Sequence, residues 1–248
     1  MVMKERINQF RRRAATYLGR SPTPMHSANG VLSLSFDDFP KSAWRVAGPI
    51  LKDHGIKATY YVAGAMCDGS NLGKVQFSER DLQDAFAAGH EVGCHTFSHT
   101  SVLSLDDAAL GAELDRNAAW VAERLDGYKM SHFAYPFGDV SLRAKQVLGQ
   151  RFVHSRSVRD GVNTNGADRN NLKAIGLESR RLPHYDLEDL IDRTAQSGGW
   201  LIAYGHDVEE NPTAYGCTPR DLERIIIMAK SAGLDILPVS RAFSTLTN

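Results

Sequence analysis

The chain has 248 residues, of which 42% are hydrophobic, and this is enough to form one large core. Its 29 basic residues balance its 29 acidic residues, so the overall charge favours neither nucleic acid nor an acidic polymer as a partner. No apolar run approaches the length of a membrane span, and the N-terminus lacks the apolar core of a secretory signal. These features predict a cytoplasmic protein that does not bind nucleic acid.

Residues 1–30 are interpreted as a basic arm and connector, which precede a single predicted domain over residues 31–248. Within the first twenty residues, the only acidic residue is Glu5, and the basic ones are Lys4, Arg6, Arg11, Arg12, Arg13 and Arg20. A basic amphipathic segment can lie on an anionic membrane surface, which would suit a lipid-linked substrate. Because the apolar stripe is short, we prefer a helix packed on the domain, or a frayed arm, and keep peripheral membrane contact as the alternative.

From residue 31 to the C-terminus, apolar runs suited to strands alternate with helical stretches, which is the pattern of an α/β fold. The predicted strands are 31–36, 58–62, 91–94, 132–135, 152–155, 178–182, 200–204 and 235–238. The predicted helices are 78–88, 104–125, 187–196 and 219–232, and residues 161–171 form one long polar loop. The cysteines, Cys67, Cys94 and Cys217, are odd in number and widely spaced, which predicts reduced thiols rather than disulfides.

Two adjacent aspartates, Asp37 and Asp38, follow the first predicted strand, and Phe39-Pro40 ends it. Neighbouring residues on a strand point to opposite faces, so both carboxylates can face one site only where the strand ends and the backbone turns. Taken alone, the pair would more simply initiate a turn.

Two histidines, His95 and His99, follow the strand predicted over residues 91–94. Their spacing of four places them on one face of a predicted helical turn, where both imidazoles can bind one cation. With Asp38 they would complete a site of two histidines and a carboxylate with open positions for water and substrate, as in catalytic zinc sites. Asp37 would then be free for acid–base chemistry.

Two further segments carry candidate chemistry. A tight turn over Tyr135-Pro136-Phe137-Gly138 follows a predicted strand, and its exposed N–H groups could stabilise an oxyanion, although an ordinary loop is the simpler interpretation. The apolar strand 200–204 is followed by His206, which suits a general acid or, alternatively, a buried hydrogen-bonded histidine.

Together these segments resemble the polysaccharide deacetylases, the NodB-homology group of carbohydrate esterase family four, over roughly residues 31–243. The resemblance implies a distorted, incomplete (β/α) barrel, a TIM-like fold with seven strands. It implies that Asp37 is the catalytic base, that Phe137 donates an oxyanion-hole N–H and that His206 is the general acid. One divalent ion, preferably zinc but also cobalt, nickel or manganese, would be held by Asp38, His95 and His99. The predicted substrate-binding residues are Phe39, Tyr135, Pro136 and Tyr204.

The chain departs from the family pattern at three places. Phe39 stands where many members have glycine, and it would narrow or pave the substrate groove. Ala134 stands where an arginine usually orients the catalytic aspartate, so we expect Arg156 or Arg159 to approach Asp37 instead. In the family, an aspartate and a tryptophan support the general-acid histidine, and this sequence has no clear counterpart of either. Asp207 is adjacent to His206, but adjacency alone does not establish a hydrogen bond.

The resemblance implies a metal-dependent hydrolase that removes N-acetyl groups from amino sugars in a polysaccharide, oligosaccharide or glycan precursor and releases acetate. A second interpretation keeps the mechanism but has a lipid-linked aminosugar as substrate, with a formyl or acetyl group removed. A third, motivated by the missing arginine, is a catalytically silent carbohydrate-binding homologue.

Overall fold

The computed structural model describes residues 2–248, with side chains from residue 7 onward. The α-helices are α1 Val2–Tyr17, α2 Lys41–Arg45, α3 Ala47–Asp53, α4 Glu79–Ala87, α5 Asp107–Arg124, α6 Leu142–Gly149, α7 Leu187–Ser197, α8 Pro219–Ser231 and α9 Val239–Thr247. The strands are β1 Pro22–Thr23, β2 Val31–Asp37, β3 Thr59–Val62, β4 Ser70–Asn71, β5 Lys74–Val75, β6 Glu91–Cys94, β7 His132–Ala134, β8 His154–Arg156, β9 Ala167–Asp168, β10 Ile175–Gly176, β11 Trp200–Gly205 and β12 Asp235–Ile236. Short 3-10 helices cover Gly64–Met66, Pro136–Gly138 and Leu182–His184.

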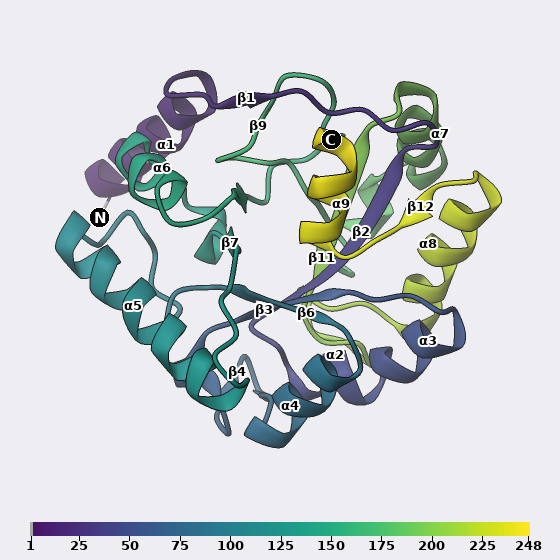
Figure 1. The fold of residues 1–248 in the computed structure, drawn as a ribbon, viewed down its shortest axis with the longest axis horizontal. Coiled ribbons are helices and arrows are strands. Elements are labelled where there is room, and N and C mark those ends of the chain that lie inside the picture. Colours follow the sequence, from purple (N-terminus) through teal and green to yellow (C-terminus); the bar gives the residue numbers. More distant parts are fainter. Residues whose placement is uncertain (1) are drawn as a thin grey trace.

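Seven parallel strands form a curled sheet in the order β10-β11-β2-β3-β6-β7-β8, and β12 pairs with the first residues of β2. Helices surround the outside of this sheet, with α2, α3, α4 and α5 along one side and α7 and α8 along another (Figure 1). The predicted distorted, incomplete barrel of seven strands is therefore confirmed.

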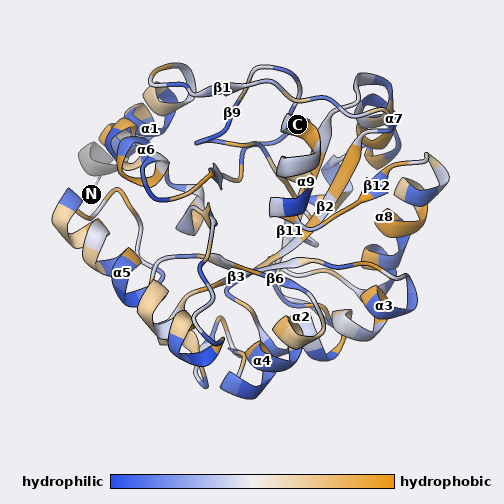
Figure 2. Ribbon diagram, viewed as in Figure 1, coloured by the Kyte–Doolittle hydropathy of each residue, from blue (hydrophilic) through white to orange (hydrophobic). Residues whose placement is uncertain are grey.

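Strand β2 lies inside the sheet, and all seven of its residues are buried. Leu32, Leu34 and Phe36 belong to the large hydrophobic cluster shared with the surrounding helices. Because strand side chains alternate, the residues between them point to the barrel interior, where Ser33 accepts a hydrogen bond from the indole of Trp200 (2.9 Å). Figure 2 shows the hydrophobic character of this strand in the middle of the fold. The alternation brings Asp37 to the interior side at the strand's end.

The C-terminal helix α9 closes the barrel at the end opposite the end of β2 where Asp37 lies. The backbone N–H of Val239 donates to the hydroxyl of Thr59 (2.9 Å), and that of Ser240 donates to the carboxylate of Glu91 (2.8 Å). Thr59 and Glu91 are the first residues of β3 and β6. The other end of the barrel, at the carboxyl ends of the strands, therefore faces the loops that carry the candidate site residues.

Most predicted elements are present, with some differences. The prediction of a strand over 178–182 is wrong. The strand is β10, Ile175–Gly176, which pairs with β11. The polar residues after Leu177 instead hydrogen-bond to the loop around Gly216. Helices α2, α3, α6 and α9 were not predicted, and the polar loop contains β9, which pairs with β1. The three cysteines are free as predicted, although Cys67 is only half-buried.

The N-terminal arm forms α1, which packs beside α6 (Figure 1). Ala15 is buried there, but the apolar residues predicted to pack are largely exposed: Phe10 and Tyr17 are 73% and 70% exposed. The side chains of Lys4 and Arg6 lie outside the described residues. None of the described helices is long and apolar enough to cross a membrane. Membrane contact through the exposed face of α1 stays a prediction.

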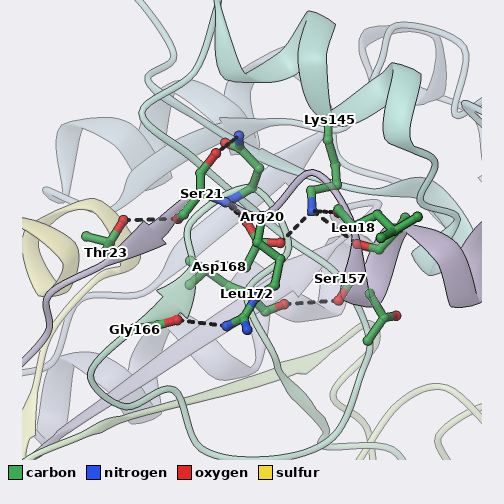
Figure 3. Close-up of polar contacts among 12 residues, drawn as sticks. Leu18, Arg20, Ser21, Thr23, Lys145, Ser157, Gly166, Asp168 and Leu172 are labelled. Atoms are coloured by element: carbon green, nitrogen blue, oxygen red, sulfur yellow. Dashed lines mark hydrogen bonds and ion pairs between the residues drawn. The ribbon is translucent and has the colours of Figure 1, made fainter.

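A buried lysine attaches the arm to the barrel (Figure 3). The ammonium group of Lys145, on α6, donates to the carbonyl oxygens of Ala15 (3.0 Å) and Leu18 (3.1 Å) at the C-terminal end of α1. It also pairs with Asp168 (2.5 Å), and both side chains are 2% exposed. A cation at a helix C-terminus is favourable because the free carbonyls there carry partial negative charge. Lys145 therefore holds α1, α6 and β9 together.

We expect Lys145→Met to lower the free energy of unfolding by about 3 kcal/mol, because it leaves the buried carboxylate of Asp168 without its cation. Urea denaturation would measure this change. The double variant Lys145→Met/Asp168→Asn should recover part of the loss, since no unpaired charge is then buried. Lys52→Met, at an exposed position on α3, is the control. A loss no larger than that of the control would contradict the role given to Lys145.

Candidate active site

Asp37 and Asp38 lie at the carboxyl end of β2 and line one cavity of about 270 Å³. Asp38 and Phe39 adopt positive φ angles of 61° and 62°, a conformation that side chains other than glycine rarely take. This turn interrupts the strand alternation, so both carboxylates reach the same cavity. Both are buried, at 3% exposed.

His95 and His99 reach the same cavity from the loop that follows β6. The prediction of a helical turn is wrong, because Thr96 and His99 have positive φ angles of 59° and 51° and the segment is irregular. Glu113 of α5 holds this loop by accepting hydrogen bonds from the N–H groups of Phe97 (3.0 Å) and Ser98 (2.7 Å). The loop shape, rather than helical spacing, brings the two imidazoles together.

The side chains of Asp38, His95 and His99 fit a metal ion. One ligand atom from each lies within 4.8 Å of the others. Nδ1 of His95 lies 2.7 Å from the carbonyl oxygen of Ala134, so it carries the proton and leaves the Nε2 lone pair for the site. Burial lowers the pKa of His95 to about 4, which keeps the imidazole neutral. Oδ1 of Asp38 is buried and accepts no hydrogen bond from the described residues, as expected of an oxygen that binds a metal ion.

Asn71 orients the carboxylate of Asp38. It lies on β4, in a small hairpin, and its amide donates to Oδ2 of Asp38 (2.9 Å), leaving Oδ1 directed toward the two histidines. The sequence around Asn71 is an ordinary polar turn, and it contains no signal for this contact.

Arg156 is the partner of Asp37. Its guanidinium donates to Oδ1 of Asp37, and neither side chain is more than 4% exposed. Burial alone would raise the pKa of Asp37, but the positive charge of Arg156 outweighs this effect, and the pKa lies below its ordinary value. Asp37 is therefore ionised and ready to accept a proton.

The position of Arg156 accounts for Ala134, which stands where the resemblance predicts an arginine. Ala134 on β7 and Arg156 on β8 are register partners, so the arginine lies one strand further along the same edge. Its guanidinium carbon lies 4.9 Å from the ring centroid of Tyr61 and 4.7 Å from that of Tyr204. These cation–π contacts hold the buried cation in place. Of the two arginines proposed from the sequence, Arg156 makes this contact, and Arg159 lines a different cavity.

His206 and Phe137 both line the same cavity. His206 follows β11, and its Nδ1 lies 3.2 Å from the carbonyl oxygen of Tyr215, which orients the ring. The carboxylate of Asp207 does not hydrogen-bond to His206; it accepts hydrogen bonds from the hydroxyl (2.6 Å) and the backbone N–H (2.7 Å) of Thr213. Phe137 has a φ angle of 60°, and its N–H donates to no acceptor within the described part of the chain.

The predicted substrate-binding residues occupy different environments. The prediction that Phe39 lies in the substrate groove is wrong. Phe39 is fully buried, and its ring packs on those of Tyr60 and Phe77 with centroid distances of 4.4 and 4.9 Å. Pro136 is also buried and does not line the cavity. Tyr135 and Tyr204 line it, although the hydroxyl of Tyr135 is occupied by the carbonyl oxygen of Asn170 (3.0 Å).

Several other residues that line the cavity were not predicted from the sequence, namely Asn71, Leu72, Val158, Glu178, Arg180, Arg181 and Tyr215. Arg181 donates to the hydroxyl of Tyr204 (2.8 Å) and pairs with Asp160 (2.6 Å). These residues come from loops whose polar composition resembles that of any surface loop, so no sequence signal separated them.

Comparison with known proteins identifies a family and several relatives. A family model described as polysaccharide deacetylase matches residues 26–151. Chitin deacetylase 1 of Cryptococcus neoformans is 28% identical over 183 residues, which cover 72% of this chain and 37% of that protein. The chain similarly covers 33% of a chitin deacetylase from Arthroderma benhamiae, at 25% identity over 52% of this chain, so it spans about a third of the length of these relatives.

Solved structures share the fold. A chitin deacetylase from Colletotrichum lindemuthianum superposes with a TM-score of 0.61 at 17% identity, covering 90% of this chain and 91% of that one. PdaA of Bacillus subtilis, a family 4 carbohydrate esterase, gives 0.62 at 14% identity, covering 94% and 88%.

We expect the protein to bind one Zn²⁺ per chain, measured by elemental analysis after equilibrium dialysis. Asp38→Asn and His99→Ala should each weaken binding by at least about a hundredfold, because each removes one of the ligands that the chain supplies. His26→Ala, which changes an exposed histidine, is the control. Undiminished zinc binding in both ligand variants would disprove the assigned site.

Proposed function

We propose that this chain, which belongs to the polysaccharide deacetylase family, is a metal-dependent hydrolase that removes N-acetyl groups from amino sugars of a saccharide and releases acetate. The observation that carries the proposal is the ionised carboxylate of Asp37, paired with Arg156, in the same cavity as the Asp38, His95 and His99 ligand group. A water molecule in that cavity would have a base and a Lewis-acid site within reach.

The metal we propose is zinc, which two histidines and a carboxylate suit, with cobalt, nickel and manganese as alternatives. Asp38, His95 and His99 would hold such an ion, which would polarise the amide carbonyl and make water more acidic. Asp37 acts as the general base and takes the proton from the attacking water. Arg156 keeps Asp37 ionised and fixes the direction of its carboxylate.

The tetrahedral intermediate carries negative charge on the former carbonyl oxygen. The free N–H of Phe137 is the donor that we assign to this oxygen, since a preorganised donor stabilises charge that develops during the reaction. His206 acts as the general acid and protonates the departing sugar amine, which is a poor leaving group without a proton. Its hydrogen bond to the carbonyl oxygen of Tyr215 keeps the ring oriented toward the cavity.

The substrate class that we propose is an N-acetylated amino-sugar saccharide, because the relatives include proteins named chitin deacetylases. A lipid-linked aminosugar, carrying an acetyl or formyl group, is the second candidate. The exposed apolar residues of α1 favour it, since they would suit a membrane surface. The missing arginine no longer argues for a catalytically silent protein, because Arg156 makes the contact with Asp37 that Ala134 cannot make.

The direct test is acetate release from N-acetylglucosamine oligomers by the zinc-reconstituted protein. We expect release that stops on removal of the metal by a chelator, and that falls by at least about a thousandfold in Asp37→Asn, because the variant has no base. Elemental analysis should show that this variant retains its zinc. Acetate release that survives both treatments would disprove the mechanism.

Arg156→Gln should lower kcat by at least about tenfold, because Asp37 loses its charged hydrogen-bond partner. The positive charge lowers the pKa of Asp37, so its removal raises that pKa and moves the acidic limb of the kcat/KM profile to higher pH. Zinc content and thermal unfolding should be measured on the same variant to separate this effect from misfolding. An unchanged pH profile in a folded, zinc-loaded variant would show that Arg156 does not act through Asp37.

A further inference from the structure

A second cavity, of about 350 Å³, lies directly beside the candidate active site. We call it the arginine pocket, and the residues of its lining that matter here are Arg12, Arg13, Thr16, Val158, Arg159 and Asn171. One wall of the pocket is α1, and the other is formed by the chain that follows β7 and β8.

The two cavities share a thin wall. Val158 lines both of them, and the consecutive residues Phe137 and Gly138 line one each. Gly138 packs so closely on Val158 that an added Cβ would lie 2.1 Å from a methyl carbon of that valine. Phe137, at the rim, is 65% exposed. A saccharide whose reacting sugar lies against Asp37 can therefore continue over this rim into the arginine pocket.

The arginine pocket is positively charged. Arg12 is paired with Asp139 (2.6 Å), but Arg13 and Arg159 form no ion pair with any described acidic group. Partial burial, together with the charge of Arg20, lowers the pKa of Arg159 although Asp168 opposes this effect. Burial and the charges of Arg159 and Arg20 also lower the pKa of Lys173. Arg20 and Lys173 do not line the pocket, so the positive charge without an ion-pair partner in its lining comes from Arg13 and Arg159, and a bound anion would neutralise it.

Asn171 supplies a second, independent indication of a ligand. It is 2% exposed, lines the arginine pocket, and its Oδ1 has no hydrogen-bond partner among the described residues. A buried carboxamide without a partner is costly, so a site of this kind normally holds a polar ligand or water. Half a turn of the amide would exchange the positions of its oxygen and its N–H₂ group, which is a donor that suits an anion.

We propose that the arginine pocket binds an anionic substituent, a phosphate or a carboxylate, carried by a sugar next to the one that is deacetylated. The inference rests on the proposed deacetylase function and narrows its substrate to negatively charged saccharides. Arginine suits this role because its planar fork of donors matches the oxygens of either group. Neutral oligomers would reach the catalytic residues but gain nothing from the pocket.

The test compares three N-acetylglucosamine tetramers under identical conditions. One is neutral, one carries a single phosphate on one C6, and one has a single C6 oxidised to a carboxylate. We expect KM for at least one charged tetramer to be roughly tenfold lower than for the neutral one, as loss of a charge-assisted hydrogen bond implies. Which of the two charged tetramers benefits identifies the source of the anion.

Arg13→Gln/Arg159→Gln should remove this preference, because KM for the charged tetramer rises to that for the neutral one. Arg241→Gln, which changes an exposed arginine on α9, is the matched control and should keep the preference. Equal KM values for all three tetramers, or a preference that survives in the double variant, would overturn the inference while the deacetylase function stands.

A binding measurement keeps the inference testable if no tetramer is hydrolysed and the proposed function fails. Inorganic phosphate is titrated calorimetrically into the metal-free protein, the double variant and Arg241→Gln. Binding that is lost only in the double variant supports the arginine pocket. Absence of binding, or equal binding by all three proteins, disproves it.

Discussion

The buried ion pair between Asp37 and Arg156 depends on the curl of the sheet. Asp37 ends β2 and Arg156 ends β8, and three strands lie between them. In a flat sheet, four strand spacings would separate the two strands by roughly 19 Å, which is too far for a side-chain contact. The curvature of the incomplete barrel brings the two strand ends across the interior, so the fold itself assembles the catalytic base with its partner.

The same ion pair has a cost in stability. Nε and Nη1 of Arg156 have no hydrogen-bond partner among the described residues, although the side chain is fully buried. Burying a charge pair in this way seldom stabilises a protein more than an apolar pair of similar volume would. The rings of Tyr61 and Tyr204 offset part of the cost through cation–π contacts. The arrangement therefore makes physical sense as a means of keeping Asp37 ionised and correctly directed.

The sequence predicted the fold better than the site. Long apolar runs such as 31–36 and 200–204 became β2 and β11, because buried strands of this length leave a clear pattern. Short helices such as α2 and α9 left a weaker pattern and were not predicted. The loop of His95 and His99 could not be foreseen, since its positive φ angles at Thr96 and His99 occur without any glycine to mark them.

Long-range packing accounts for the remaining differences. Phe39 follows two aspartates that line the cavity, and its own positive φ angle turns its ring away into the core, toward Phe77. Arg156 and Arg159 were equivalent candidates in the sequence, and they were separated only by the register of β8 against β7. Contacts of this kind depend on which strands lie side by side, which a local pattern does not contain.

One carboxylate connects the N-terminal helix with both catalytic loops. Asp139 follows Phe137 and Gly138, and it accepts hydrogen bonds from Arg12 of α1 and from Ser101, two residues after His99. The loop that carries the proposed oxyanion donor is thereby held from the side of α1 and from the side of the metal ligands. A donor preorganised in this way needs no rearrangement as charge develops on the substrate.

Helix α1 lies before the region matched by the family model, yet it supports the loop between the two cavities and forms a wall of the second. Its position therefore ties the shape of the active site to the shape of the arginine pocket.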